Sequence, residues 1–368
     1  MSDHTGSIVT VNGQIEPDEL GMTLTHEHTF INMENWGPDL ESAYERGRYD
    51  EPITLENQWY LRRNPDVNKD NLVLGSYSEA VNEMSRFKRE GGSSIIDVTP
   101  KGPPGQDPKA VQRVSRETGL NIIQGTAYYV RSGHPDRIDD MTLGEIRDEF
   151  VSDVEDGIDD TDIYAGIVGE IGLSVNKEAN IYEKELNVLR AGAQAALQTG
   201  ASLTIHPPGR LERAQKDGTY PTSRWALEVM DIVEEEGLPA GRVVMDHMDR
   251  TLIEDLEYQK ELAERGAYLE YDLFGSEFYY EEWNDGYPSD NWRVDATIEL
   301  IKQGYVSNLL FSHDICHKIQ RTKYGGNGYG HIPRSIVPLM KRKGVTDEQI
   351  NKILVENPTE MLTLEDPE

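Results

Sequence analysis

Short, continuously apolar runs alternate with longer amphipathic segments along most of the chain. The apolar positions in the short runs do not alternate with polar ones, which is typical of parallel strands covered on both faces. Eight such runs are predicted to be strands: residues 22–25, 94–99, 121–126, 164–168, 202–205, 242–246, 267–271 and 308–311.

The segments between these runs have the apolar spacing of helices that bury one face. The predicted helices are residues 78–90, 110–118, 180–199, 223–236, 252–265 and 294–303. A glycine follows several of these segments, where a left-handed residue would end a helix before the next strand begins. These glycines are Gly91, Gly119, Gly200, Gly237, Gly266 and Gly304.

Eight strand–helix repeats of about 40 residues predict an α/β fold, namely a (β/α)8 TIM barrel. We expect a short N-terminal β segment before the barrel, long loops at its mouth, and a single domain over residues 1–368. An open doubly wound sheet is the structural alternative, but no Gly-x-Gly-x-x-Gly motif follows the first strand to support dinucleotide binding.

Two long segments are predicted to be loops over the mouth of the barrel, where substrate selection usually resides. The first, residues 30–74, is rich in Asn, Tyr, Trp, Pro and charged residues. The second, residues 274–292, carries aromatic residues among carboxylates: Phe278, Tyr279, Tyr280, Trp283, Tyr287 and Trp292. Its aromatic residues are interpreted either as a packed lid or subunit contact, or as a direct contact with substrate.

The chain has 67 Asp and Glu residues against 36 Lys and Arg, which gives a formal net charge of -31. A surface of this charge repels phosphates, which argues against nucleic acid and anionic membranes as partners. No apolar run approaches the roughly 20 residues that a membrane span needs, and residues 1–4 do not resemble a signal peptide. A single cysteine, Cys316, excludes an internal disulfide and a cysteine-based zinc site. We therefore expect a cytoplasmic protein that acts on a small molecule.

The acidic residues are scattered over predicted helix faces and loops, as in residues 148–160, and are not gathered in one tail. Repulsion of this size destabilises a compact fold in dilute buffer and is screened by concentrated salt. Our hypothesis is a halophilic host, with an ordinary acidic cytosolic protein as the alternative. A melting series in KCl is expected to show a melting temperature that rises with salt, and a temperature that does not rise would contradict the hypothesis.

Polar residues follow the ends of five predicted strands. They are His26 and His28, Glu170, His206, His247 and Asp314. In an extended segment, residues two apart point the same way, so His26 and His28 can face a common centre while Glu27 points away. Imidazoles with carboxylates suit borderline divalent metals such as zinc. Four histidines and two carboxylates exceed what one tetrahedral ion uses, which favours two ions that share a bridging carboxylate and a bridging water.

The other histidines and the cysteine are assigned different roles. His4 is expected in solvent and His313 in a structural role, whereas three histidines can reach the mouth: His134, His317 and His331. Cys316 lies two residues past Asp314, but no motif recruits a base to it. The chain also lacks the Gly-x-Ser-x-Gly elbow of serine hydrolases. A nucleophilic side chain is therefore not expected.

Several short motifs follow one another along the chain. They are Gly-Met-Thr-Leu-Thr-His-Glu-His at 21–28 with 9–15 and 17–20 before it, 126–129, Gly-Glu-Ile-Gly at 169–172, the strand ends at His206 and His247, Asp314, 325–330 with 332–333, and 356–358. Together they resemble the phosphotriesterase family of the amidohydrolase superfamily, over nearly the whole chain. The resemblance implies a binuclear metal centre.

On this pattern His26, His28 and Asp314 hold the more buried ion, and His206 and His247 hold the more exposed one. The best-known members bridge the ions with a carbamylated lysine, whereas this chain has Glu170 at that place. It therefore resembles the glutamate-bridged phosphotriesterase homology proteins. A glutamate supplies the same two oxygens and the same charge, but phosphotriester hydrolysis does not follow from the family name.

The resemblance also implies the reaction and its catalytic residues. A bridging hydroxide attacks the substrate, and Asp314 accepts a proton and passes it towards the leaving group. Tyr129 matches a tyrosine that similar lactonases place near the metals. The expected substrate-binding residues are Tyr128, Tyr129, His317, Lys318 and Arg321. The expected cofactors are two divalent ions, with zinc favoured and manganese, cobalt or iron as alternatives, and the family's habit implies a homodimer.

The substrate class remains open between several hypotheses. An uncharged lactone is favoured, because the second mouth loop is acidic and His317 stands where phosphate-binding relatives have arginine. The basic residues Lys318, Arg321 and Lys323 keep a carboxylated or sulfonated substrate open, unless they are a solvated surface run. The alternatives are hydrolysis of an N-acyl amine or of a phosphotriester and, in a different class, a metal-bearing binding protein without catalysis.

Overall fold

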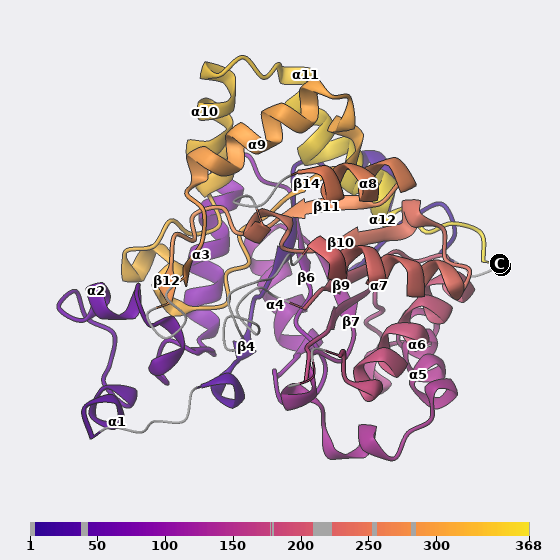
Figure 1. Ribbon diagram of the computed structural model, residues 1–368, viewed down its shortest axis with the longest axis horizontal. Helices are drawn as coiled ribbons and strands as arrows, with labels where there is room; N and C mark the ends of the chain where they lie inside the picture. Colours follow the sequence, from indigo (N-terminus) through magenta and orange to yellow (C-terminus); the bar gives the residue numbers. More distant parts are fainter. Residues whose placement is uncertain are drawn as a thin grey trace.

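Eight parallel strands curl into a nearly closed barrel in the computed structural model, which describes residues 4–37, 43–176, 178, 180–208, 223–251, 256–280 and 285–367 (Figure 1). In order around the sheet the strands are β3 (Thr23–Glu27), β6 (Ser94–Asp97), β7 (Asn121–Thr126), β8 (Ile167–Gly172), β9 (Leu203–His206), β10 (Val243–Met245), β11 (Tyr268–Tyr271) and β14 (Leu309–Phe311). The first and last strands meet where the Thr25 hydroxyl donates to the carbonyl of Phe311, at 3.2 Å. The predicted (β/α)8 barrel is therefore confirmed.

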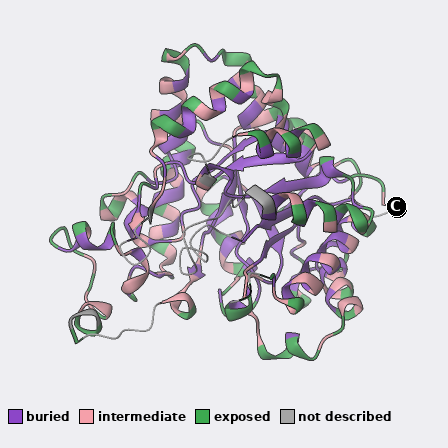
Figure 2. Cartoon of the chain, in the orientation of Figure 1, coloured by how far each residue is buried: buried purple, intermediate pink, exposed green. Residues whose placement is uncertain are grey.

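Helices surround the strands and shield them from solvent (Figure 2). The covering helices are α3 (Tyr77–Arg89), α4 (Pro108–Thr118), α5 (Leu143–Glu155), α6 (Glu183–Thr199), α7 (Ser223–Glu235), α8 (Glu257–Arg265) and α9 (Asp290–Lys302). Strand residues such as Leu24, Ile95 and Leu203 have no exposed surface, as expected for strands covered on both faces. Among the described residues, no helix has both the length and the apolar character needed to cross a membrane.

Short elements at the two ends of the chain complete the fold. The predicted N-terminal β segment is an antiparallel hairpin of β1 (Ile8–Thr10) and β2 (Gly13–Ile15). It joins the barrel through the Val11 amide, which donates to the carbonyl of Ile122 in β7 at 2.9 Å. The last part of the chain forms α10 (Val337–Arg342), α11 (Asp347–Asn351) and α12 (Asn357–Leu362).

The fourth strand differs most from its prediction. The apolar run at 164–168 predicted its position, but β8 continues to Gly172 and includes Glu170. A buried carboxylate inside a strand is tolerated when other side chains bond it, and three histidines surround Glu170.

Helix α5 was not predicted, because carboxylates interrupt its apolar stripe. Two of these carboxylates pair with Lys101, whose Nζ lies 2.7 Å from Asp153 and 3.2 Å from Glu149.

The two predicted mouth loops contain their own secondary structure. The first holds α1 (Ala43–Tyr49), α2 (Gln58–Leu61) and an antiparallel pair, β4 (Ile31–Asn32) and β5 (Val73–Leu74). The second holds the hairpin of β12 (Tyr279–Tyr280) and β13 (Asp285–Gly286), while Trp283 lies outside the described residues. Apolar contacts join the loops in a cluster of Tyr60, Leu61, Phe278, Tyr280 and Ile319. The loops are therefore packed against each other over the barrel mouth.

Candidate metal centre

The six predicted ligands come together at the carboxyl ends of five of the eight barrel strands. His26 lies in β3 with His28 one residue after it, Glu170 lies in β8 and His206 ends β9. His247 lies two residues after β10 and Asp314 three residues after β14. All six side chains are buried or nearly so. Parallel strands bring residues that are far apart in sequence to one end of the barrel, where the active sites of this fold lie.

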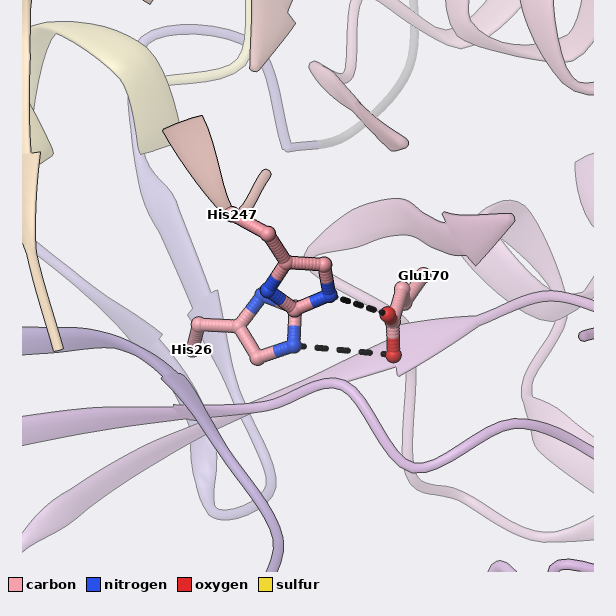
Figure 3. A group of neighbouring side chains, drawn as sticks. All are labelled: His26, Glu170 and His247. Carbon is pink, nitrogen blue, oxygen red and sulfur yellow. Dashed lines mark ion pairs between the residues drawn. The ribbon is translucent and has the colours of Figure 1, made fainter. Parts of the chain in front are cut away.

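The carboxylate of Glu170 is surrounded by three histidines from different strands. Its Oε2 lies 3.5 Å from Nε2 of His26, and its Oε1 lies 3.0 Å from Nδ1 of His206 and 3.4 Å from Nε2 of His247. Figure 3 shows His26 and His247 meeting the two different oxygens of this carboxylate. A carboxylate whose two oxygens meet different histidines can serve two cations.

A second group adjoins the first through His26. Nε2 of His28 lies 3.3 Å from Oδ1 of Asp314, and ligand atoms of His26, His28 and Asp314 lie within 4.8 Å of one another. The atoms of His26, Glu170 and His247 meet the same limit. Two clusters that share His26, one of which includes Glu170, thus contain donors for more than one cation.

The ring nitrogens of His26 indicate whether these residues fit a metal. Both of its ring nitrogens are buried, and neither has a hydrogen-bond partner within the described part of the chain. Buried polar atoms are normally satisfied, and a coordinated cation would satisfy Nε2. Two of the other three histidines are held by their second nitrogen: Nδ1 of His28 lies 3.0 Å from the Thr99 hydroxyl, and Nδ1 of His247 lies 2.8 Å from Asp272. Such outer partners orient metal-binding imidazoles, so the donor set fits.

Two of the candidate ligands have an unfavourable backbone conformation. His247 and Asp314 have φ values of 57° and 48°, in the left-handed region that non-glycine residues rarely adopt. Hydrogen bonds hold both residues there: the His247 amide donates to Asp272 at 3.0 Å, and the Asp314 amide donates to the carbonyl of His26 at 3.2 Å. Strain of this kind persists where the surroundings over-determine it and concentrates at functional sites.

Behind His26 lies a carboxylate cluster that the sequence analysis missed. Nδ1 of His26 is 3.7 Å from Asp246, 3.6 Å from Glu270 and 3.5 Å from Asp272. Burial and the charge of Glu270 together raise the pKa values of Asp246 and Asp272 well above the ordinary value, although the charge of His26 opposes them. The sequence held a signal, because Glu270 and Asp272 lie two residues apart and so point to one face.

Metal binding is expected to release protons. Burial lowers the pKa values of His26 and His28, but Glu170 and Asp246 outweigh it for His26, and Asp314 does so for His28, so both pKa values are raised. A proton on a ligand nitrogen must leave before a metal coordinates, so metal affinity falls as the pH falls through these raised pKa values. Titration of the metal-free protein with Zn²⁺ in buffers of different ionisation enthalpy measures the release.

His206 and His247 are not expected to contribute to this proton release. Burial lowers the pKa of His206 to about 3 and that of His247 to about 4, so both are neutral near pH 7 and release no proton. Binding enthalpies that do not depend on the buffer near neutral pH would contradict protonation of His26 and His28.

A cavity of about 330 Å³ opens over the site. Four of the predicted ligands reach it, together with Tyr129, Cys316 and His317. The first mouth loop contributes Trp36, whose ring meets that of Tyr129 edge-on at 5.2 Å. The second contributes Tyr280 and Tyr287. The mouth loops therefore supply the aromatic walls of the cavity and the barrel supplies its polar floor.

The expected substrate-binding residues divide into two groups. Tyr129 and His317 line the cavity, with the Tyr129 hydroxyl 2.9 Å from Nδ1 of His206. Three others do not line it. Tyr128 points away, as adjacent residues of a strand end do, and donates to Glu149 at 2.6 Å. Lys318 pairs with Asp70, and the fully buried Arg321 donates to the carbonyl of Thr29 at 3.0 Å. These basic residues hold loops together, which corrects the expectation that they face substrate.

The remaining histidines and the cysteine have structural neighbours. Nδ1 of His313 lies 2.7 Å from Glu27, whose carboxylate also accepts from the amides of His313 and Ile315. His134 and His331 bond the carbonyl of Tyr129 and the carboxylate of Asp290. Burial and the charge of Asp314 raise the pKa of Cys316 well above the ordinary value, so its thiol keeps its proton and is a poor nucleophile.

Comparisons with known proteins identify the family. The model of the phosphotriesterase family matches residues 6–362. N-acetyltaurine hydrolases from Danio rerio and Dictyostelium discoideum are 39% and 38% identical, with 99% of this chain covered and 99% and 100% of theirs. The crystal structure of a resiniferatoxin-binding protein from Rhodobacter sphaeroides superimposes with a TM-score of 0.91 at 34% identity, covering 98% of this chain and 97% of that one. The chain therefore belongs to the phosphotriesterase family and is a metal-dependent hydrolase.

Proposed function

We propose that this protein hydrolyses the amide bond of small N-acyl amines at a pair of divalent metal ions. The observation that carries the proposal is the position of Glu170, with one oxygen towards His26 and the other towards His206 and His247, beneath an open cavity. The substrate class is supported by relatives that are named N-acetyltaurine hydrolase and align over 99% of this chain.

The six candidate ligands divide between two ions in this proposal. His26, His28 and Asp314 would hold one ion, His206 and His247 the other, and Glu170 would bridge them. Zinc suits this set of imidazoles and carboxylates, and manganese, cobalt and iron accept the same ligands. When bound, such a pair of ions lowers the pKa of water towards neutrality and polarises the substrate carbonyl.

The chain's own side chains would then move the protons. Burial would raise the pKa of Asp314, but the hydrogen bond from His28 and the charge of His26 outweigh it and hold the pKa below its usual range. Asp314 is therefore a carboxylate that can accept the proton of water and deliver it to the leaving nitrogen. Burial and the charge of Glu170 raise the pKa of Tyr129 well above the ordinary value, so this hydroxyl keeps its proton and can donate to the substrate.

Release of acetate from N-acetyltaurine tests the proposal. Protein reconstituted with Zn²⁺ is expected to release acetate and taurine in equal amounts, and protein stripped by a chelator is expected to lose this activity and regain it with metal. A panel of lactones assayed with the same sample provides the comparison. Turnover of lactones without turnover of any N-acyl amine would contradict the proposed substrate class, and full activity after exhaustive chelation would contradict the metal-dependent mechanism.

Lactone hydrolysis is the second candidate, because the position of Tyr129 suits an ester as well as an amide. The Tyr129 hydroxyl lies beside His206 at the edge of the cavity, where it could donate to the oxygen atoms of an ester as well as to an amide carbonyl. Esters and amides share an attack by water on a polarised carbonyl. They differ in the leaving group, since a departing amine requires a proton more than a departing alcohol does.

A further inference from the structure

Arg250 faces the cavity that lies over the candidate metal centre. It belongs to the short helical turn Met248–Thr251, three residues after His247. Among the described residues that line the cavity, Arg250 is the one lysine or arginine. The sequence analysis did not single it out, because only the fold places the start of this loop at the cavity wall.

The guanidinium of Arg250 has no bonded partner in the described part of the chain. Its Nε is buried without a hydrogen bond, and its guanidinium lies over the ring of Tyr287, with Cζ 6.0 Å from the ring centroid. By contrast, Arg293 donates to three different residues, Asp249, Asp290 and Ser276. Buried donors are normally paired, so the unpaired guanidinium is available to a molecule that enters the cavity.

The carboxylates of the cavity do not explain this arginine. Asp66 pairs with His317 at 2.9 Å, Asp314 lies 3.3 Å from His28, and Glu170 is surrounded by histidines. Each acidic group of the lining therefore already has a cationic or hydrogen-bonding neighbour. The charges of Asp272 and Asp314 act on Arg250, but no carboxylate of the described residues bonds its guanidinium, and an anionic group of a ligand would.

We infer that Arg250 binds an anionic group on the substrate, so that the enzyme acts on N-acyl amines bearing a terminal sulfonate or carboxylate. This inference rests on the proposed function, since it places the scissile amide at the metal centre of the same cavity. The planar guanidinium can donate two parallel hydrogen bonds to two oxygens of a sulfonate or carboxylate, which a lysine cannot reproduce. Lys318 and Arg321 are already bonded to other parts of the chain, so they do not compete for this role.

Arg250→Met tests the inference with two substrates of similar length, N-acetyltaurine and the uncharged N-acetylethanolamine. For N-acetyltaurine, kcat/KM is expected to fall by about tenfold to a hundredfold, mainly through KM, as for loss of a charge-assisted hydrogen bond. For N-acetylethanolamine, kcat/KM is expected to stay at the wild-type value. Arg250→Lys should recover part of the loss for the anionic substrate. Arg131→Met, which removes an arginine that is 52% exposed and outside the cavity lining, is the matched control.

Binding of ethanesulfonate provides a readout that does not depend on turnover. Calorimetry with the metal-loaded protein is expected to give a dissociation constant that rises by about tenfold or more in Arg250→Met and not in Arg131→Met. If wild-type protein hydrolyses no N-acyl amine but Arg250→Met still weakens ethanesulfonate binding, the proposed function fails and the anion site stands. Unchanged ethanesulfonate binding in Arg250→Met, or equal losses with both substrates, would overturn the role of Arg250.

Discussion

Asp314→Asn is expected to lower kcat by about 10²- to 10⁴-fold, the usual contribution of a positioned general base. Asparagine keeps the size of the side chain, but its amide cannot accept a proton from water. In the metal-free protein, the hydrogen bond from His28, with Nε2 3.3 Å from Oδ1, and the charge of His26 hold the pKa of Asp314 below its usual range, so the group is a carboxylate before metal binds. The measurement is kcat for N-acetyltaurine at saturation, with the metal content of the same sample determined by elemental analysis.

The metal content shows whether Asp314→Asn loses activity because it loses metal or because it loses the general base. Asp314 is also a candidate ligand, so the comparison is made on samples that hold equal amounts of metal after reconstitution. Asp139→Asn is the matched control, because it removes a carboxylate that is 61% exposed and lies outside the cavity lining. Wild-type kcat in a fully loaded Asp314→Asn sample would show that another group accepts the proton.

Arg293→Met is expected to reduce the free energy of unfolding by about 3–5 kcal/mol, because it leaves a buried charge without its partner. Arg293 has no exposed surface, and its Nε donates to Asp249 at 2.6 Å. Its other nitrogens donate to Asp290 at 3.0 Å and to the carbonyl of Ser276 at 2.8 Å. Methionine fills the space of the stem but leaves Asp249 without its cationic partner, with only the Leu273 amide donating to it at 3.1 Å. Urea unfolding of the metal-loaded protein measures the change.

A surface arginine provides the control for this measurement. Arg265 pairs with Asp231 and Glu234 on the helical exterior, where both carboxylates are well exposed. Arg265→Met is expected to change the free energy of unfolding by no more than about 1 kcal/mol. Equal losses in the two variants would contradict the larger contribution expected of the buried Arg293.

The barrel could be predicted because its strands and helix ends are marked by short stretches of sequence. Continuous apolar runs mark strands buried on both faces, and glycines such as Gly119 and Gly200 mark the helix ends, where both residues have positive φ. Helix α5 escaped prediction since its buried Asp153 is balanced by Lys101, a residue 52 positions away. A carboxylate of this kind looks like a surface residue until its partner is known.

The candidate ligands could be predicted because the fold repeats their position, at the end of a strand. The roles of residues at the barrel mouth could not be predicted, because their neighbours come from loops that are distant in sequence. Lys318 and Arg321 seemed free in sequence, yet one bonds Asp70 and the other the carbonyl of Thr29. Arg250 gave no signal in sequence, although it is the arginine of the cavity lining.

Anomalous X-ray diffraction from crystals of the metal-loaded protein tests the central claim most directly. The account predicts two metal peaks, one beside His26, His28 and Asp314 and the other beside His206 and His247. The carboxylate of Glu170 should lie between the peaks, with one oxygen directed to each. A single peak at full metal loading, or a Glu170 carboxylate directed away from both peaks, would contradict the account.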